Sequence, residues 1–115
     1  MDNSRSVKLG VNMDLEQQLG NEMLKLYGLA KVKCNYNATR FIQMFYKLGA
    51  IETAKTLINS KNPTDGFTAM WECHCLDLTI EFLALNPKYK ELFSNEELAK
   101  ARKKLSDYGY NLQDS

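Results

Sequence analysis

The chain has few of the side chains from which active sites and metal centres are commonly built. It contains one histidine, His74, so a nucleophile paired with a histidine base can be assembled in very few ways. A structural zinc site needs four ligands, whereas the cysteines offer one close pair, Cys73 and Cys75, and a distant Cys34. We therefore expect no catalytic residue, no metal site and no cofactor, and we expect the protein not to be an enzyme.

The cysteines are also a poor basis for disulfides. They are odd in number, three in all, and Cys73 and Cys75 are separated by one residue. On a helix these two side chains would point about 200° apart. We predict three reduced thiols, as is usual in a cytosolic protein.

Long apolar runs and an excess of one charge are missing too. No window approaches the roughly 18 apolar residues of a membrane span, and the start, MDNSRSVKLG, lacks the apolar run of a signal peptide. We therefore expect a cytoplasmic protein with no membrane contact. Charged residues make up 25% of the chain but the formal net charge is +1, so no overall field attracts nucleic acid.

Apolar stripes at helical spacing follow one another along the chain, and no segment alternates with the period of a strand. We predict an all-α fold, a single compact bundle of five to six short helices with a flexible N-terminal tail. The tail covers residues 1–11, the helical domain 12–110, and a C-terminal tail 111–115.

Caps and breakers divide the domain into helices over 12–31, 38–48, 51–58, 66–73, 78–85 and 94–109. The expected N-terminal caps include Asp65, Asp77, and Ser94 in a capping box with Glu97. Glycines 49 and 109 are expected to end two of the helices. The apolar faces predict one core that contains Phe41, Phe45, Leu57, Trp71, Leu78, Phe82 and Leu105.

The chain resembles a small helical module found in many uncharacterised bacterial and phage proteins, either alone or at the C-terminal end of longer chains. The segments that carry the resemblance are YNATRFIQMFYKLGAIETAKTLI, DGFTAMWE, LDLTIEFLAL and LFSNEELAKARKKLSDYGY, within about residues 34–110. The resemblance implies a discrete folding unit and no established activity. Met70 stands where the module usually has Leu. Cys73, His74 and Cys75 replace Gly, Arg or other polar residues, so they are not carried over as site residues.

Arg40 is the first candidate binding residue. A cation in the first turn of a helix is disfavoured by the helix dipole, so we expect Arg40 to have a partner. One possibility is an internal ion pair with Glu72 that fixes two helices together. The other is a binding patch formed by Tyr36, Arg40 and Trp71, residue types that are frequent at protein hot spots and in base stacking.

The last helix carries further candidates on a face that we expect to be exposed: Lys100, Lys103 and Lys104, beside Arg102. These residues either contact phosphates or form an ordinary solvated face.

These features predict a non-catalytic small interaction protein that docks a helical surface on a protein partner. A specific form of this hypothesis is a mobile-element-encoded inhibitor of a host defence nuclease. The alternative is a nucleic-acid-binding module accessory to a defence or restriction system, against which the near-neutral charge argues. The sequence leaves the partner's identity and the oligomeric state open.

Overall fold

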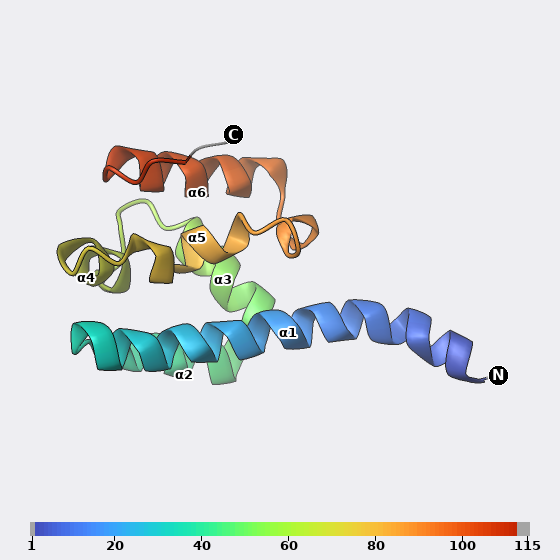
Figure 1. Cartoon of the computed structure of the whole chain (residues 1–115). Helices are drawn as coiled ribbons and strands as arrows, with labels where there is room; N and C mark the ends of the chain where they lie inside the picture. Colours follow the sequence, from blue (N-terminus) through green and yellow to red (C-terminus); the bar gives the residue numbers. More distant parts are fainter. Residues whose placement is uncertain (1, 113–115) are drawn as a thin grey trace.

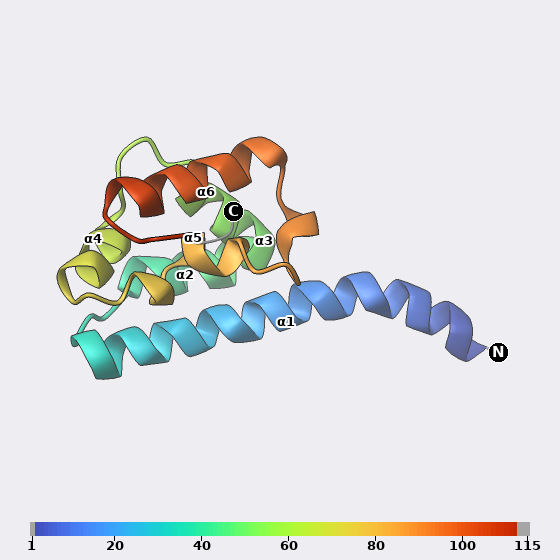
Figure 2. The ribbon, with the colours of Figure 1, turned by 45° about the horizontal axis from the view of Figure 1, so that its top comes forward.

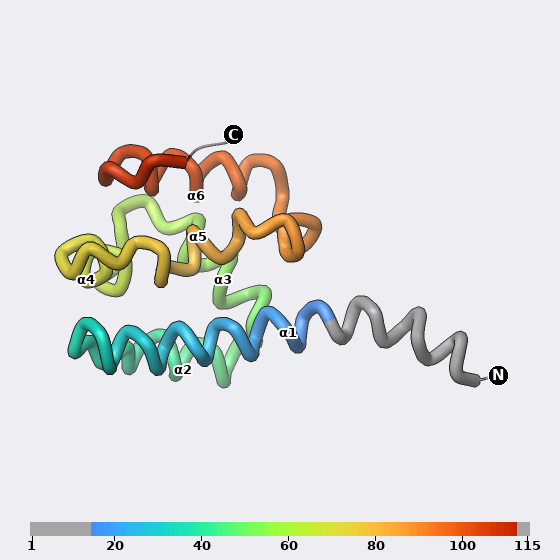
Figure 3. The backbone as a smooth tube through the Cα atoms, viewed as in Figure 1, coloured from blue at the N-terminus to red at the C-terminus, as the bar shows by residue number. Residues whose placement is uncertain are grey.

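A computed structural model describes the backbone of residues 2–112 and the side chains of residues 15–112 (Figure 3). Within residues 2–112 the chain forms helices and no strand, which confirms the predicted all-α fold. The predicted tail over 1–11 and the predicted helix start at Asn12 lie outside the part described with side chains. Among the described residues, every helix is either too short or too polar to span a bilayer.

Six α-helices and two short 3-10 helices, η1 and η2, follow one another through the described residues. Their order is α1 (Asp2–Cys34), α2 (Thr39–Leu48), α3 (Ala50–Ile58), α4 (Asp65–Glu72), η1 (Leu76–Leu78), α5 (Ile80–Ala84), η2 (Lys90–Leu92) and α6 (Asn95–Asp107).

The helix ends show which capping predictions hold. Ser94 and Glu97 form the predicted capping box at the start of α6. The caps of α4 and α5 are Thr64 and Thr79, whose hydroxyls accept hydrogen bonds from Phe67 N–H and Phe82 N–H at 3.2 Å. Asp65 and Asp77 were therefore wrongly predicted as caps. Because Thr79 is extended, with ψ of 159°, the single helix predicted over 78–85 is divided into η1 and α5.

The helices stack in three layers. The lowest contains α1 and α2, the middle one α4 and α5, and the uppermost α6, while α3 rises from the lowest layer to contact both others (Figures 1 and 2). Aromatic side chains hold α2 against α1, with the rings of Tyr27 and Phe41 stacked 6.2 Å apart. Gly20 faces this contact, and a Cβ there would lie at ordinary van der Waals distances from Phe45 and Ala50, 3.4 and 3.5 Å.

The interior holds two apolar clusters rather than the single core that the sequence predicted. The larger cluster joins α1, α3, α5 and α6 and includes Leu19, Met23, Ala54, Ile58, Leu83 and Ala101. The smaller is built on Phe67, Leu76 and Leu105. Among the predicted core residues, Leu105 is fully buried, Phe82 is half-buried and Trp71 is 43% exposed. Trp71 was misplaced because α4 turns its indole towards the end of α6.

Candidate functional site

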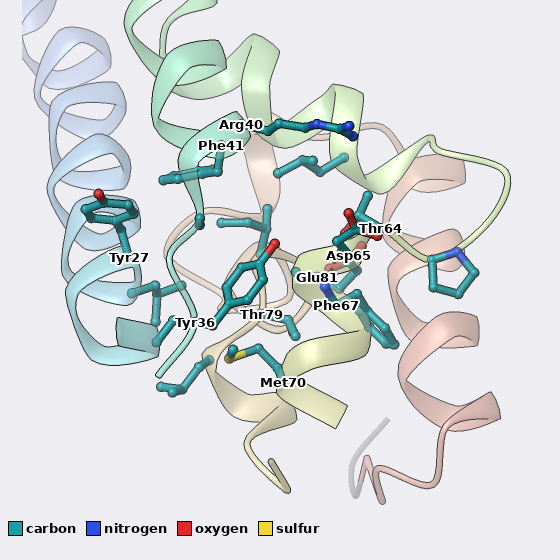
Figure 4. A pocket seen from close by; sticks show the side chains of 18 of the residues that line it. Tyr27, Tyr36, Arg40, Phe41, Thr64, Asp65, Phe67, Met70, Thr79 and Glu81 are labelled. Carbon is teal, nitrogen blue, oxygen red and sulfur yellow. Dashed lines mark hydrogen bonds between the residues drawn. The ribbon is translucent and has the colours of Figure 1, made fainter. Parts of the chain in front are cut away.

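A groove of about 670 Å³ opens between the end of α1, the start of α2, the 60–64 loop and the α4–α5 region (Figure 4). Apolar side chains form much of its wall, among them Tyr27, Phe41, Met44, Phe67, Met70 and Ile80. Its volume is within the range of about 300–1,000 Å³ that is typical of ligand sites. The groove is therefore the candidate binding site, and the predicted binding residues are described by whether they line it.

Tyr36 projects into the groove because the chain folds back after α1. Asn35 takes a left-handed conformation, with φ of 53°, and Tyr36 N–H donates to Ala30 C=O at 3.1 Å. The ring then packs on the first turn of α4, where a Cβ at Gly66 would lie 3.7 Å away. Burial raises the pKa of Tyr36, the charge of Asp65 adds to this, and the charge of Arg40 opposes it. Its hydroxyl points to the side that holds Arg40 and Asp65 (Figure 4).

Arg40 lines the edge of the groove as an exposed residue in the first turn of α2. That turn contains no acidic residue, and no ion pair in the described part of the chain includes Arg40. The predicted pair with Glu72 is therefore absent, and Glu72 is exposed at the end of α4. A cation at a helix N-terminus without an internal partner is available to an anionic group from outside.

Glu81 lines the groove, but its charge is compensated by an ion pair with a lysine of the same chain. Lys104 Nζ lies 2.9 Å from its Oε2, and Lys104 also donates to Leu57 C=O at 3.0 Å. Burial raises the pKa of Glu81, while the charge and hydrogen bond of Lys104 and a backbone hydrogen bond act in the opposite direction. Lys104 is thus a half-buried structural residue, and its predicted place on an exposed face is wrong.

Lys100 and Lys103 are exposed on α6, as predicted, but each has a partner within the chain. Lys100 donates to Asn59 Oδ1 and Lys103 to Asp107 Oδ2, both at 3.0 Å. Neither residue lines the groove. The structure therefore does not join the lysines to the Arg40 site.

Trp71 also lies away from the groove. Its indole packs edge-on against Tyr108, with ring centroids 5.3 Å apart, and it is not among the lining residues. The predicted patch of Tyr36, Arg40 and Trp71 is consequently divided: the first two share the groove, and Trp71 lies at the junction of α4 with the end of α6.

Some groove residues were missed by sequence reasoning. Tyr27 was not singled out as a candidate from the sequence, and Asp65 was predicted only as a helix cap, yet both line the groove. Glu81 carried a usable signal, because a single carboxylate inside the apolar segment from Leu78 to Leu85 requires a buried cationic partner. The sequence could not say which lysine that partner is.

The pairing of the cysteines differs most from what the sequence predicted. Cys34 and Cys73 form a disulfide between the ends of α1 and α4, and Cys75 is free. The prediction of three reduced thiols, with Cys34 distant from the others, is therefore wrong for this structure. The cause is tertiary, since the α1 and α4 ends meet although 39 residues separate these cysteines in the sequence.

No protein-family model, curated protein or solved structure matches this chain. The resemblance to a small helical bacterial and phage module stays a prediction.

Proposed function

We propose that this chain is a non-catalytic interaction protein that binds a segment of a protein partner in the groove beside Arg40. The supporting observation is Arg40 itself, an exposed guanidinium without an ion pair in the described chain, at the rim of an apolar groove. Arginine and tyrosine are enriched among residues that dominate protein binding, and Tyr36 lines the same groove as Arg40.

The charges around the groove favour an acidic partner segment. Arg40 and Lys61 line the groove and form no ion pair in the part of the chain that the structure describes. Of the two acidic residues that line it, Asp65 is exposed and Glu81 is paired with Lys104. We propose that a carboxylate of the partner pairs with Arg40 and that an apolar neighbour packs on Phe41 and Met44, which line the groove. Such a carboxylate would also gain from the positive end of the α2 dipole.

A narrower form of the proposal makes the partner a host defence nuclease and the chain its cytoplasmic inhibitor, encoded by a mobile element. The support for this form is the sequence profile: a short, near-neutral chain with no recognisable chemistry. It is tested by adding the protein to candidate nucleases and measuring cleavage.

The second candidate function is nucleic-acid binding through α6, favoured by the exposed Lys100 and Lys103. Their contacts with Asn59 and Asp107 weaken it, because a phosphate would have to compete with these partners. Binding of this kind would depend steeply on salt, which separates it from a groove-centred protein contact.

The experiment is affinity capture from lysate of the source cells, with and without nuclease treatment, using the full chain and two variants. Arg40→Ala removes the groove cation. Lys47→Ala is the matched control, because it removes an exposed cation from the same helix outside the groove. The proposal expects one protein to be recovered with wild type and Lys47→Ala and lost with Arg40→Ala, whether or not nucleic acid is digested. Equal recovery in all three would contradict it.

A further inference from the structure

The C-terminal ends of α1 and α4 bring four sulfur atoms together. Cys34 is the last residue of α1, Cys73 is the C-cap of α4, and Cys75 follows two residues later. The Sγ atoms of these three cysteines all lie within 4.8 Å of one another. The thioether of Met70 lies 3.9 Å from Cys34 Sγ. These residues come from two helices and a turn, so the cluster exists only in the folded chain.

The turn after α4 explains how Cys73 and Cys75 come to share a side. His74 N–H donates to Trp71 C=O at 3.1 Å, and Cys75 N–H donates to Met70 C=O at 2.7 Å. These two bonds form a Schellman motif, with His74 in the left-handed conformation at φ of 63°. The helix therefore stops before Cys75, and the two Sγ atoms lie 3.9 Å apart instead of diverging as they would on a helix.

We propose that, when the Cys34–Cys73 disulfide is reduced, this cluster binds one Cu(I) ion. The thiolates of Cys34, Cys73 and Cys75 would be the ligands, and the Met70 thioether a weak fourth donor. Thiolate and thioether sulfurs favour soft ions such as Cu(I). Zn²⁺ would lack a fourth ligand from the protein, since the potential ligand group in the described residues contains only these three cysteines.

The surroundings of the cluster suit a cation. The C-terminal end of a helix carries partial negative charge, and the ends of both α1 and α4 point at this cluster. The Lys33 carbonyl oxygen also lies 3.7 Å from Cys73 Sγ. The three cysteines are half-buried and Met70 is 3% exposed, so the sulfurs are partly shielded from water and still reachable.

Disulfide and metal exclude each other, because the disulfide consumes two of the three thiolates. A water-soluble phosphine converts one state into the other. The phosphorus gives two electrons to the Cys34–Cys73 bond, which breaks. Water supplies the oxygen of the phosphine oxide and the two protons of the thiols. Cu(I) then displaces the protons of the three thiols when it binds.

The test is an anaerobic titration of the full chain with Cu(I) against a chromophoric Cu(I) chelator, before and after phosphine reduction. We expect one Cu(I) per reduced chain and none held tightly by the oxidised chain. Cys75→Ser should abolish the tight site even after reduction. Because this variant retains Cys34 and Cys73, circular dichroism of its oxidised form shows whether its fold is intact.

Two methionine variants test the Cu(I) site without changing any cysteine. Met70→Leu should weaken Cu(I) binding about tenfold, as expected when a subsidiary group of a metal site is lost. Met44→Leu is the matched control, since Met44 lines the groove but is absent from the sulfur contacts, and it should bind as wild type does. Absence of Cu(I) binding by the reduced chain, full binding by Cys75→Ser, or preference for Zn²⁺ in a parallel titration would each overturn the proposal.

Discussion

Lys104 and Glu81 form an ion pair in the interior, with Nζ 2.9 Å from Oε2, and thereby join α6 to α5. Their side chains are only 13% and 3% exposed. Two charges taken from water are stabilised mainly by each other, so loss of one leaves the other buried and uncompensated. Lys104 further satisfies the Leu57 carbonyl at the end of α3, so the pair fixes three helices behind the groove.

Lys104→Ala should accordingly destabilise the fold by about 3–5 kcal/mol, because Glu81 would stay in the interior without its partner. Chemical denaturation gives the free energy of unfolding. Lys103→Ala is the control: its pair with Asp107 is exposed on both sides and should contribute less than about 1 kcal/mol. Similar losses in the two variants would show that the Glu81 pair is not buried as described.

Glu97 predicts a stability loss in acid. Burial tends to raise its pKa, but hydrogen bonds from the Ser94 backbone, Asn59 and Lys55, together with the charge of Lys55, lower it from 4.5 to about 2. A lowered folded-state pKa gives stability that is present above pH 4.5 and is lost as the pH falls towards 2, on the order of 3 kcal/mol in total.

The comparison of wild type with Glu97→Gln isolates this effect. Glu81, whose pKa is raised, acts oppositely: its ionisation lowers stability as the pH rises above 4.5, and this contribution is the same in both proteins. We expect wild type to be clearly more stable at pH 7 and the difference to shrink towards pH 2. A difference that does not change with pH would contradict the assignment.

The Cys34–Cys73 disulfide predicts that a reducing agent lowers the melting temperature. It closes a loop across 39 residues, and a native disulfide typically contributes about 2–4 kcal/mol. Thermal unfolding with and without phosphine measures this. Cys34→Ser should be less stable than wild type and insensitive to phosphine, whereas Cys75→Ser should respond as wild type does. An unchanged wild-type melting temperature would contradict a disulfide in the native protein.

His74 predicts opposite outcomes for two substitutions. Its φ of 63° lies in the left-handed region, which glycine adopts freely and β-branched residues avoid. His74→Gly should be at least as stable as wild type, and His74→Val should lose about 1–2 kcal/mol. Both are compared by urea denaturation, and a Val variant as stable as the Gly variant would show that the turn differs.

Local chemistry made part of the fold predictable. Ser94 and Glu97 satisfy each other's backbone N–H groups whatever surrounds them, so their spacing alone identified the start of α6. Gly49 and Gly109, with φ of 87° and 90°, likewise ended helices where predicted. At α5 the local signal was ambiguous, because Asp77 and Thr79 are both good caps and only the tertiary fold selects Thr79.

The candidate site was harder to predict than the helices, because it depends on which segments the tertiary structure brings together. Arg40 was identified because a cation is unusual in the first turn of a helix, and Tyr36 because its residue type is frequent at hot spots; the structure places both in one groove. The partner of Arg40 could not be read from the sequence, since Glu72 is only one of many acids on helical surfaces. The sulfur cluster was missed because it requires the ends of α1 and α4 to meet.

The binding affinity of Arg40→Ala for the captured partner, measured by calorimetry beside its melting temperature, tests the proposed groove most directly. We expect a loss of about 2 kcal/mol or more, as for a hot-spot residue, with the melting temperature nearly unchanged because Arg40 has no ion pair in the described chain. Lys47→Ala should bind like wild type. Undiminished affinity in Arg40→Ala, or a loss seen only in a Lys100→Ala/Lys103→Ala variant with steep salt dependence, would contradict the account.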